Sequence, residues 1–125
     1  MNASTKALVR QRAGHHCEYC QLHQADSPLA VLHIEHVIPK KHGGSDDVEN
    51  LALACIDCNL HKGPNLTGID PESGDVVELF HPRRQRWSDH FEWRSVYIVG
   101  KTATGRTTVR VLDMNSDDQL VLRSS

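Results

Sequence analysis

Aromatic side chains are scarce in this sequence, and long apolar runs are absent. Only 5% of the 125 residues are Phe, Trp or Tyr, so the apolar core of the protein is expected to be thin. No run approaches the roughly 20 apolar residues that a membrane-spanning helix needs, and the N-terminal residues contain no hydrophobic signal segment. These absences argue against a membrane protein and favour one small cytoplasmic unit that needs extra stabilisation.

Strong net charge is also lacking. Lys and Arg number 14 and Asp and Glu number 16, which gives a net charge of −2. This balance argues against a protein that coats nucleic acid by charge alone. The basic residues nevertheless gather in short runs at 40–42, 61–62 and 83–86, so a local basic rim around one site stays compatible with the composition.

The four cysteines form two CxxC pairs, and they are Cys17, Cys20, Cys55 and Cys58. In a reducing compartment two such pairs indicate one tetrahedral zinc site. Four thiolates close the coordination sphere, so this zinc is expected to stabilise the fold and to do no catalysis. Disulfide bonding is the alternative, although secreted scaffolds space their cysteines less regularly.

Periodicity and chain-breaking residues predict an α+β protein. Helices are expected over 5–13, 57–62 and 115–122, with Ser4 and Asn115 as N-caps and Gly14 and Gly63 after the first two. Strands are expected over 29–35, 51–54, 76–80, 96–99 and 107–112.

Further motifs lie between the cysteine pairs and just beyond them: His-Ile-Glu-His at 33–36, Gly43-Gly44, Asn50-Leu51, and Asn59 directly after Cys58. In this order and within this zinc frame they resemble the HNH endonuclease family, over about residues 14–64. The resemblance implies a ββα-metal (His-Me finger) core, which hydrolyses DNA phosphodiesters with one divalent metal ion. Residues 1–64 would be this core with an N-terminal helix, and residues 65–125 a small β-rich C-terminal extension packed on it.

The resemblance also assigns roles to individual residues. His36 falls on the general base and Asn50 on the residue that orients the base and its loop. Glu35 and Asn59 fall on the ligands of a catalytic Mg²⁺ or Mn²⁺, where Asp and His are commoner in the family. These two departures bear on metal preference and on activity.

The chemistry of these side chains suits phosphodiester hydrolysis. An imidazole such as that of His36 accepts a proton from water near neutral pH. Oxygen donors from Glu35 and Asn59 suit Mg²⁺ or Mn²⁺ and leave positions for phosphate and water. Basic side chains nearby are candidates for phosphate binding, and they are Lys62, His61 and Lys40.

Strand geometry leaves one alternative open. On a regular strand Glu35 and His36 point to opposite faces, whereas His33 and Glu35 share a face. The assignment of His36 as base therefore needs the strand to end or twist near this residue. If the strand stays regular, His33 with Glu35 becomes the better metal-binding pair.

The second half carries aromatic and basic residues but no recognised site. Packing against the core is one role for Trp87, Phe91 and Trp93. A contact between the arginines at 83–86 and a DNA backbone is the other.

For the whole chain, a non-catalytic zinc module that binds nucleic acid or protein is the alternative to a DNA endonuclease. A hydrolase of small phosphodiesters is a third possibility. The oligomeric state is not predicted.

Overall fold

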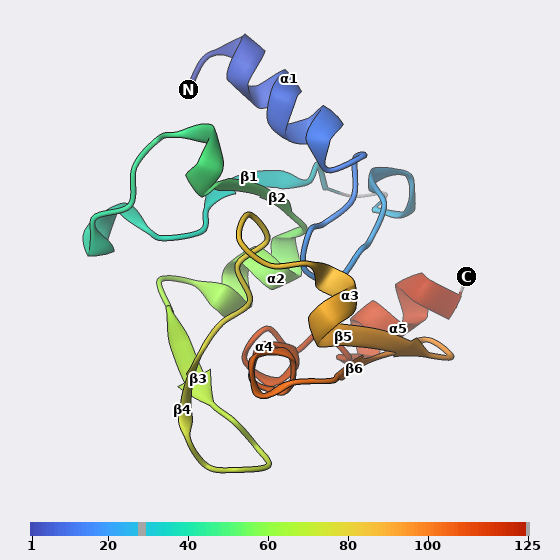
Figure 1. Ribbon diagram of the computed structural model, residues 1–125. Coiled ribbons are helices and arrows are strands. Elements are labelled where there is room, and N and C mark those ends of the chain that lie inside the picture. Colours follow the sequence, from blue (N-terminus) through green and yellow to red (C-terminus); the bar gives the residue numbers. More distant parts are fainter. Residues whose placement is uncertain (28–29, 125) are drawn as a thin grey trace.

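The computed structural model describes residues 1–27 and 30–124. Its N-terminal half places one helix ahead of a hairpin and a second helix (Figure 1). These elements are α1 (Ala3–Arg12), β1 (His33–His36), β2 (Leu51–Ala54) and α2 (Ile56–Lys62). Strands β1 and β2 pair antiparallel from His33↔Ala54 to His36↔Leu51. Together with α2 they make the ββα unit that the sequence predicts.

The C-terminal half consists of two further hairpins and three helices. They are β3 (Thr67–Ile69), β4 (Val76–Glu78), α3 (Trp87–His90), β5 (Phe91–Arg94), β6 (Tyr97–Gly100), α4 (Ala103–Val111) and α5 (Asp117–Ser124). Each hairpin is a separate two-stranded antiparallel sheet. In Figure 1 the β3–β4 hairpin extends to the lower left, and α4, β5, β6 and α5 lie together below α2.

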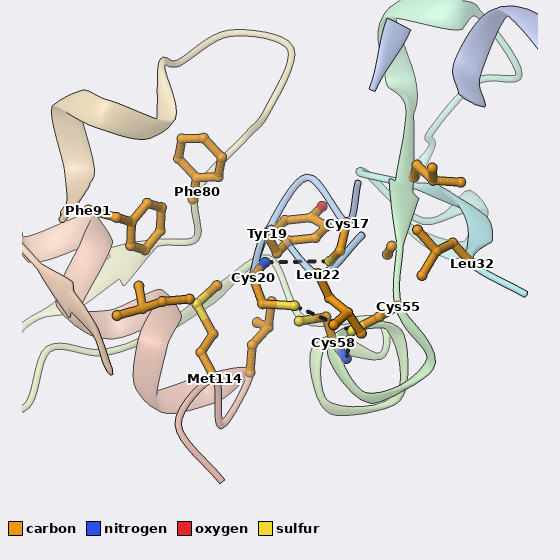
Figure 2. Close-up of a cluster of buried hydrophobic side chains, with 14 of the residues drawn as sticks. Cys17, Tyr19, Cys20, Leu22, Leu32, Cys55, Cys58, Phe80, Phe91 and Met114 are labelled. Carbon is orange, nitrogen blue, oxygen red and sulfur yellow. Dashed lines mark hydrogen bonds between the residues drawn. The ribbon is translucent and has the colours of Figure 1, made fainter. Parts of the chain in front are cut away.

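One apolar core joins the two halves. Tyr19 and Leu53 from the first half are fully buried in the same cluster as Phe80, Phe91 and Met114 from the second (Figure 2). The Phe80 ring contacts the Tyr19 ring edge-on with centroids 6.5 Å apart. Phe80 and Phe91 therefore supply apolar area that the first half lacks, and Trp87 packs against the same core, whereas Trp93 is 46% exposed.

Element boundaries differ from the predictions where side-chain caps differ. Asn2 caps α1, because its Oδ1 accepts a hydrogen bond from the Thr5 backbone N–H at 2.8 Å, so the helix begins before Ser4. Strand β1 begins only at His33, and the predicted start at Leu29 lies outside the described residues. The predicted strands at 76–80 and 96–99 correspond to β4 and β6 with shifted ends, whereas α3, β3 and β5 were not predicted.

The prediction of a strand over 107–112 is wrong, because this segment belongs to helix α4. Its β-branched residues favour a strand locally, but Thr102 caps a helix by accepting from the Gly105 N–H at 3.0 Å. Buried positions then recur at helical spacing, at Gly105, Thr108 and Leu112. Burial of this helical face outweighs the local preference for a strand.

The last helix also differs from its prediction. It begins at Asp117, and Asn115 does not cap it. The Asn115 carboxamide instead bonds the backbone of Ile98 in β6, with Nδ2 donating to its C=O at 2.8 Å and Oδ1 accepting from its N–H at 2.9 Å. Asn115 therefore anchors the segment that leads into α5 to strand β6 of the β5–β6 hairpin. Among the described residues no helix is long and apolar enough to cross a membrane.

Candidate active site and metal centre

The four cysteines meet as the sequence predicts. Their Sγ atoms all lie within 4.8 Å of one another, and all four residues are buried. Figure 2 shows them between the first CxxC turn and helix α2. No disulfide links cysteines in the described part of the chain, and the Sγ atoms of Cys20 and Cys55 are 3.6 Å apart. Sulfurs bound tetrahedrally at about 2.3 Å from a zinc ion would be about 3.8 Å apart, so the spacing fits zinc.

The surroundings of the thiols also fit a cation. Each CxxC turn directs a backbone N–H at its first sulfur, from Cys20 to Cys17 and from Cys58 to Cys55, both at 3.4 Å. Hydrogen bonds from the other three thiols lower the pKa of Cys55, whereas burial raises the pKa of Cys17. A divalent cation would stabilise all four as thiolates.

Helix α5 contributes an unexpected side chain to this centre. Gln119 is buried, and its Nε2 lies 3.6 Å from Cys55 Sγ and 3.3 Å from Asp57 Oδ2. An amide N–H that donates to a ligating sulfur orients it and balances part of its charge. Sequence reasoning did not find Gln119, because it lies 61 positions after Cys58 and only the tertiary packing of α5 brings it there.

His36 is held by an acidic side chain from the loop that joins β1 and β2. Its Nε2 lies 2.7 Å from Oδ1 of Asp46. Lys40 Nζ donates to the other carboxylate oxygen at 3.2 Å. The hydrogen bond from His36, and then that from Lys40, lower the pKa of Asp46, which therefore stays ionised. Asp46 is not among the site residues that the sequence predicts, so this contact is a finding of the structure.

Asn50 fixes the shape of the same loop. Its Oδ1 accepts from the Ile38 N–H at 2.9 Å, and its Nδ2 donates to the C=O groups of Ile38 and Ser45 at 3.0 and 2.9 Å. Gly44 permits this arrangement, since a Cβ there would lie 1.6 Å from the Ile38 carbonyl oxygen. The two ends of the loop are thereby pinned to each other, which places Asp46 beside His36.

Glu35 has a buried and fully partnered carboxylate. The Tyr19 hydroxyl donates to its Oε1, and Lys62 Nζ lies 3.6 Å from its Oε2. Lys62 is itself buried and donates to the Val37 carbonyl at 2.8 Å. Burial raises the pKa of Glu35, and the Lys62 charge opposes this rise. Burial followed by the Glu35 charge raises the pKa of Tyr19 well above its usual range, so the phenol remains a donor.

The pairing of β1 with β2 stays regular through His36, so adjacent side chains alternate between faces. Glu35 points into the protein toward Tyr19 and Lys62, and His36 lies half-buried beside the loop. His33 is exposed. The strand therefore does not by itself bring Glu35 and His36 to one point. Its regular pairing meets the condition under which His33 with Glu35 is the alternative metal-binding pair, and the roles of all three residues remain predictions.

The remaining predicted site residues lie on or near α2 and the loop. Asn59 is half-buried on α2, and no hydrogen bond of its carboxamide is found within residues 1–27 and 30–124. His61 is exposed, with its Nδ1 2.8 Å from the Asp57 carbonyl oxygen. Lys40 is exposed and paired with Asp46, so of the predicted phosphate-binding residues only Lys62 is buried.

The three arginines at 83–86 differ in their surroundings. Arg83 is nearly buried and forms an ion pair with Glu18, whose other oxygen accepts from the Leu53 N–H at 2.8 Å. Arg84 and Arg86 are exposed. Of the three arginines proposed to contact DNA, Arg83 is thus occupied in joining the two halves of the protein.

Comparison with known proteins agrees with the geometry. Residues 17–65 match the family model of the HNH endonuclease. Over 118 residues the chain is 28% identical to the Septu protein PtuB of Bacillus thuringiensis. The match covers 93% of this chain and 43% of that protein, so the chain spans less than half the length of this relative. No solved structure matches the chain. Residues 17–65, which match the HNH endonuclease family model, contain both the four-cysteine centre and the β1–β2–α2 unit.

Proposed function

We propose that this protein is a metal-dependent endonuclease that hydrolyses DNA phosphodiester bonds, with His36 as the general base. The observation that carries the proposal is the pairing of His36 with Asp46 inside the segment that matches the HNH endonuclease family. A zinc frame alone requires no such pair, whereas a general base needs a partner that fixes its ring and its tautomer.

The pairing leaves one ring nitrogen for chemistry. Asp46 is an ionised acceptor, so Nε2 of His36 carries the proton that is shared with it. Nδ1 is then the nitrogen that accepts a proton from water. The imidazole is 24% exposed, which gives water and substrate access while the ring stays supported. Lys40 and His61 are proposed to contact the flanking phosphates from the exposed rim.

The proposed Mg²⁺ or Mn²⁺ ion would be held by Asn59 and Glu35, and when bound it would neutralise charge on the phosphoryl oxygens. The Asn59 carboxamide fits this role, since it is half-buried and uncommitted among the described residues. Glu35 fits it only after an exchange of partners, because Tyr19 and Lys62 occupy both of its oxygens. In that exchange the Lys62 ammonium would become available to a phosphate.

Nicking of supercoiled plasmid tests the proposal, with each divalent metal ion added in turn. We expect His36→Ala to reduce the nicking rate about 10²- to 10⁴-fold. His42→Ala, an exposed loop variant, is the control and should retain activity. Loss of activity in His33→Ala but not in His36→Ala would assign the general base to His33. A wild-type protein that is inactive with every metal ion would contradict the proposal.

A second candidate function is a non-catalytic zinc module that binds nucleic acid or a partner protein. The ion pair between Glu35 and Lys62 favours it, because a carboxylate that is already neutralised does not need a metal. This candidate predicts no response to Mg²⁺ and no loss of function in Glu35→Gln. The endonuclease proposal predicts that Glu35→Gln raises the Mg²⁺ concentration needed for half-maximal nicking.

A further inference from the structure

A pocket of about 300 Å³ lies between residues of the predicted core (1–64, here called the HNH segment) and residues of the C-terminal extension that follows it. The HNH segment contributes Val37, Ile38 and Lys62 to its lining, and the extension contributes residues of β3, β4 and the turn that follows β4. The volume reaches the lower end of the range that small-molecule sites occupy. The described structure thus contains a hollow of ligand size that neither half forms alone.

The pocket adjoins the proposed catalytic residues through the chain. Val37 and Ile38 follow His36 directly, and Ile38 is the residue to which the Asn50 side chain is bonded. Lys62 follows Asn59 by one helical turn on α2. A strand of nucleic acid with one phosphate at His36 therefore has a neighbouring nucleotide within reach of this pocket.

The extension side of the pocket carries one arginine and one glutamate. Arg84 lines it with an exposed guanidinium, and no ion pair of Arg84 is found in the described part of the chain. Burial, and then the positive charge of Arg84, lower the pKa of His81, which also lines the pocket. Arg83 and Lys62 act on the pKa of His81 in the same direction. Glu78 is the one acidic residue in the lining.

His81 adds a neutral hydrogen-bond donor. Its Nδ1 accepts from the Arg83 backbone N–H at 3.2 Å, which leaves the ring proton on Nε2. Gln85 holds the turn by accepting from the His81 N–H at 2.8 Å. The turn over 81–85 therefore presents one fixed donor and one free cation to the pocket.

Part of the remaining lining is apolar. Val37 and Ile38 contribute to it from the first half, and Leu79 and the buried Phe80 contribute from the second. Apolar and aromatic walls accept the flat face of a nucleobase, and a cation at the rim accepts its phosphate. A free inorganic anion would use only the second of these features.

We infer that this pocket receives one unpaired nucleotide of the nucleic-acid substrate, with the base between the apolar walls and the phosphate at Arg84. The inference rests on the proposed function, because it assigns to the extension a role in holding the strand that His36 cuts. Since a base within a duplex is stacked and paired, the pocket selects single-stranded or locally opened DNA.

The test measures binding without cleavage, in the His36→Ala background and without added Mg²⁺ or Mn²⁺. The probe is fluorescently labelled octathymidylate, titrated by fluorescence anisotropy at several salt concentrations. We expect Arg84→Ala to weaken binding about 5- to 10-fold and to reduce the slope of log K against log salt by about 0.7. Arg86→Ala removes the same charge from an exposed residue outside the pocket lining, and it should change the affinity less than about twofold.

A second variant tests the base. Thr67 lines the pocket from the exposed strand β3, so Thr67→Phe fills it without disturbing the core. In the parent protein, we expect thymidine 5′-monophosphate to displace the oligonucleotide at a lower concentration than inorganic phosphate does. We expect the Thr67→Phe variant to keep its melting temperature but to lose binding of thymidine 5′-monophosphate. Equal competition by phosphate and by the nucleotide would overturn the base-binding part of the inference.

The two proposals fail separately. If wild-type protein nicks DNA but Arg84→Ala and Thr67→Phe bind octathymidylate as the parent does, the pocket assignment is wrong and the endonuclease stands. If binding depends on Arg84 and Thr67 as expected but no metal supports nicking, the nucleotide pocket stands and the endonuclease is wrong.

Discussion

The ammonium of Lys62 lies 3.6 Å from Oε2 of Glu35, and the two side chains are only 2% and 6% exposed. Two charges so far from water stabilise each other only as a pair, because either one alone carries an uncompensated cost of burial. The phenol of Tyr19 completes the arrangement by donating to the other carboxylate oxygen. This cluster links the first CxxC turn, strand β1 and helix α2.

Removal of the lysine charge is expected to destabilise the fold. Lys62→Met should lower the free energy of unfolding by about 3 kcal/mol, measured by urea denaturation at pH 8. Lys41→Met, at an exposed position of the loop, is the control and should change it by less than about 0.5 kcal/mol. Equal effects of the two variants would show that the buried pair contributes nothing.

The cost of Lys62→Met should depend on pH. Burial raises the pKa of Glu35 in the folded state, and loss of Lys62 removes the charge that opposes this rise. A carboxyl group with a raised pKa favours folding when it is protonated, and this contribution is lost as pH rises through the folded-state pKa. The variant should therefore be closer to wild type in stability at pH 5.5 than at pH 8, and a deficit that grows toward low pH would contradict this account.

The contact between Asp46 and His36 should appear in catalysis. Asp46→Asn removes the charge that holds Nε2, and we expect nicking to slow about 10-fold, equivalent to about 1.4 kcal/mol. Asp47→Asn changes the neighbouring exposed acid, which has no side-chain contact with His36, and should leave the rate unchanged. Rates are compared at saturating Mg²⁺ or Mn²⁺, so that a change in metal affinity is not mistaken for a change in the base.

The two adjacent glycines of the loop should differ in their tolerance of substitution. A Cβ at Gly44 would collide with the Ile38 carbonyl oxygen and lie 2.9 Å from Nδ2 of Asn50. Gly44→Ala should therefore displace the loop and reduce nicking more strongly than Gly43→Ala. Gly43 has φ +86° with nothing within 4 Å of an added Cβ, so its substitution should cost only about 1 kcal/mol of backbone strain. Both variants are assayed for melting temperature and for nicking.

Gln119 should affect zinc retention. Gln119→Met keeps the volume but removes the N–H that lies against Cys55 Sγ, and we expect zinc affinity to fall about 10-fold. Competition with a chromogenic chelator measures this affinity, and Gln11→Met on the exposed side of α1 is the control. If the two variants release zinc at the same chelator concentration, the contact with the sulfur is incidental.

The features that the sequence predicted are those that local spacing determines. Two CxxC turns can present their sulfurs to one ion in few ways, so the metal centre followed from the positions of the cysteines. Strand β2 matched its prediction to the residue, since four apolar residues stand between the turn at Val48–Asn50 and Cys55. Helix α2 differed by one residue at its start.

The features that the sequence did not predict depend on contacts between distant segments. Asp46 reaches His36 only because Asn50 and Gly44 fold the intervening loop, and an acidic residue in a loop looks solvated until that fold is known. The segment at 107–112 has β-branched residues that favour a strand, yet its burial against the hairpins requires a helix. For the second half, the sequence predicted that aromatic residues pack against the core, but it did not predict which residues of the first half they contact.

Trp87 in the extension donates from Nε1 to the Tyr19 backbone carbonyl at 2.7 Å, and Phe80 packs edge-on against the ring of the same tyrosine. Tyr19 in turn holds Glu35, so part of the segment that matches the HNH family model depends on residues beyond its C-terminal limit. Transplanting residues 17–65 alone into another protein would leave this tyrosine uncovered. The minimal portable unit is accordingly longer than the segment by which the family is recognised.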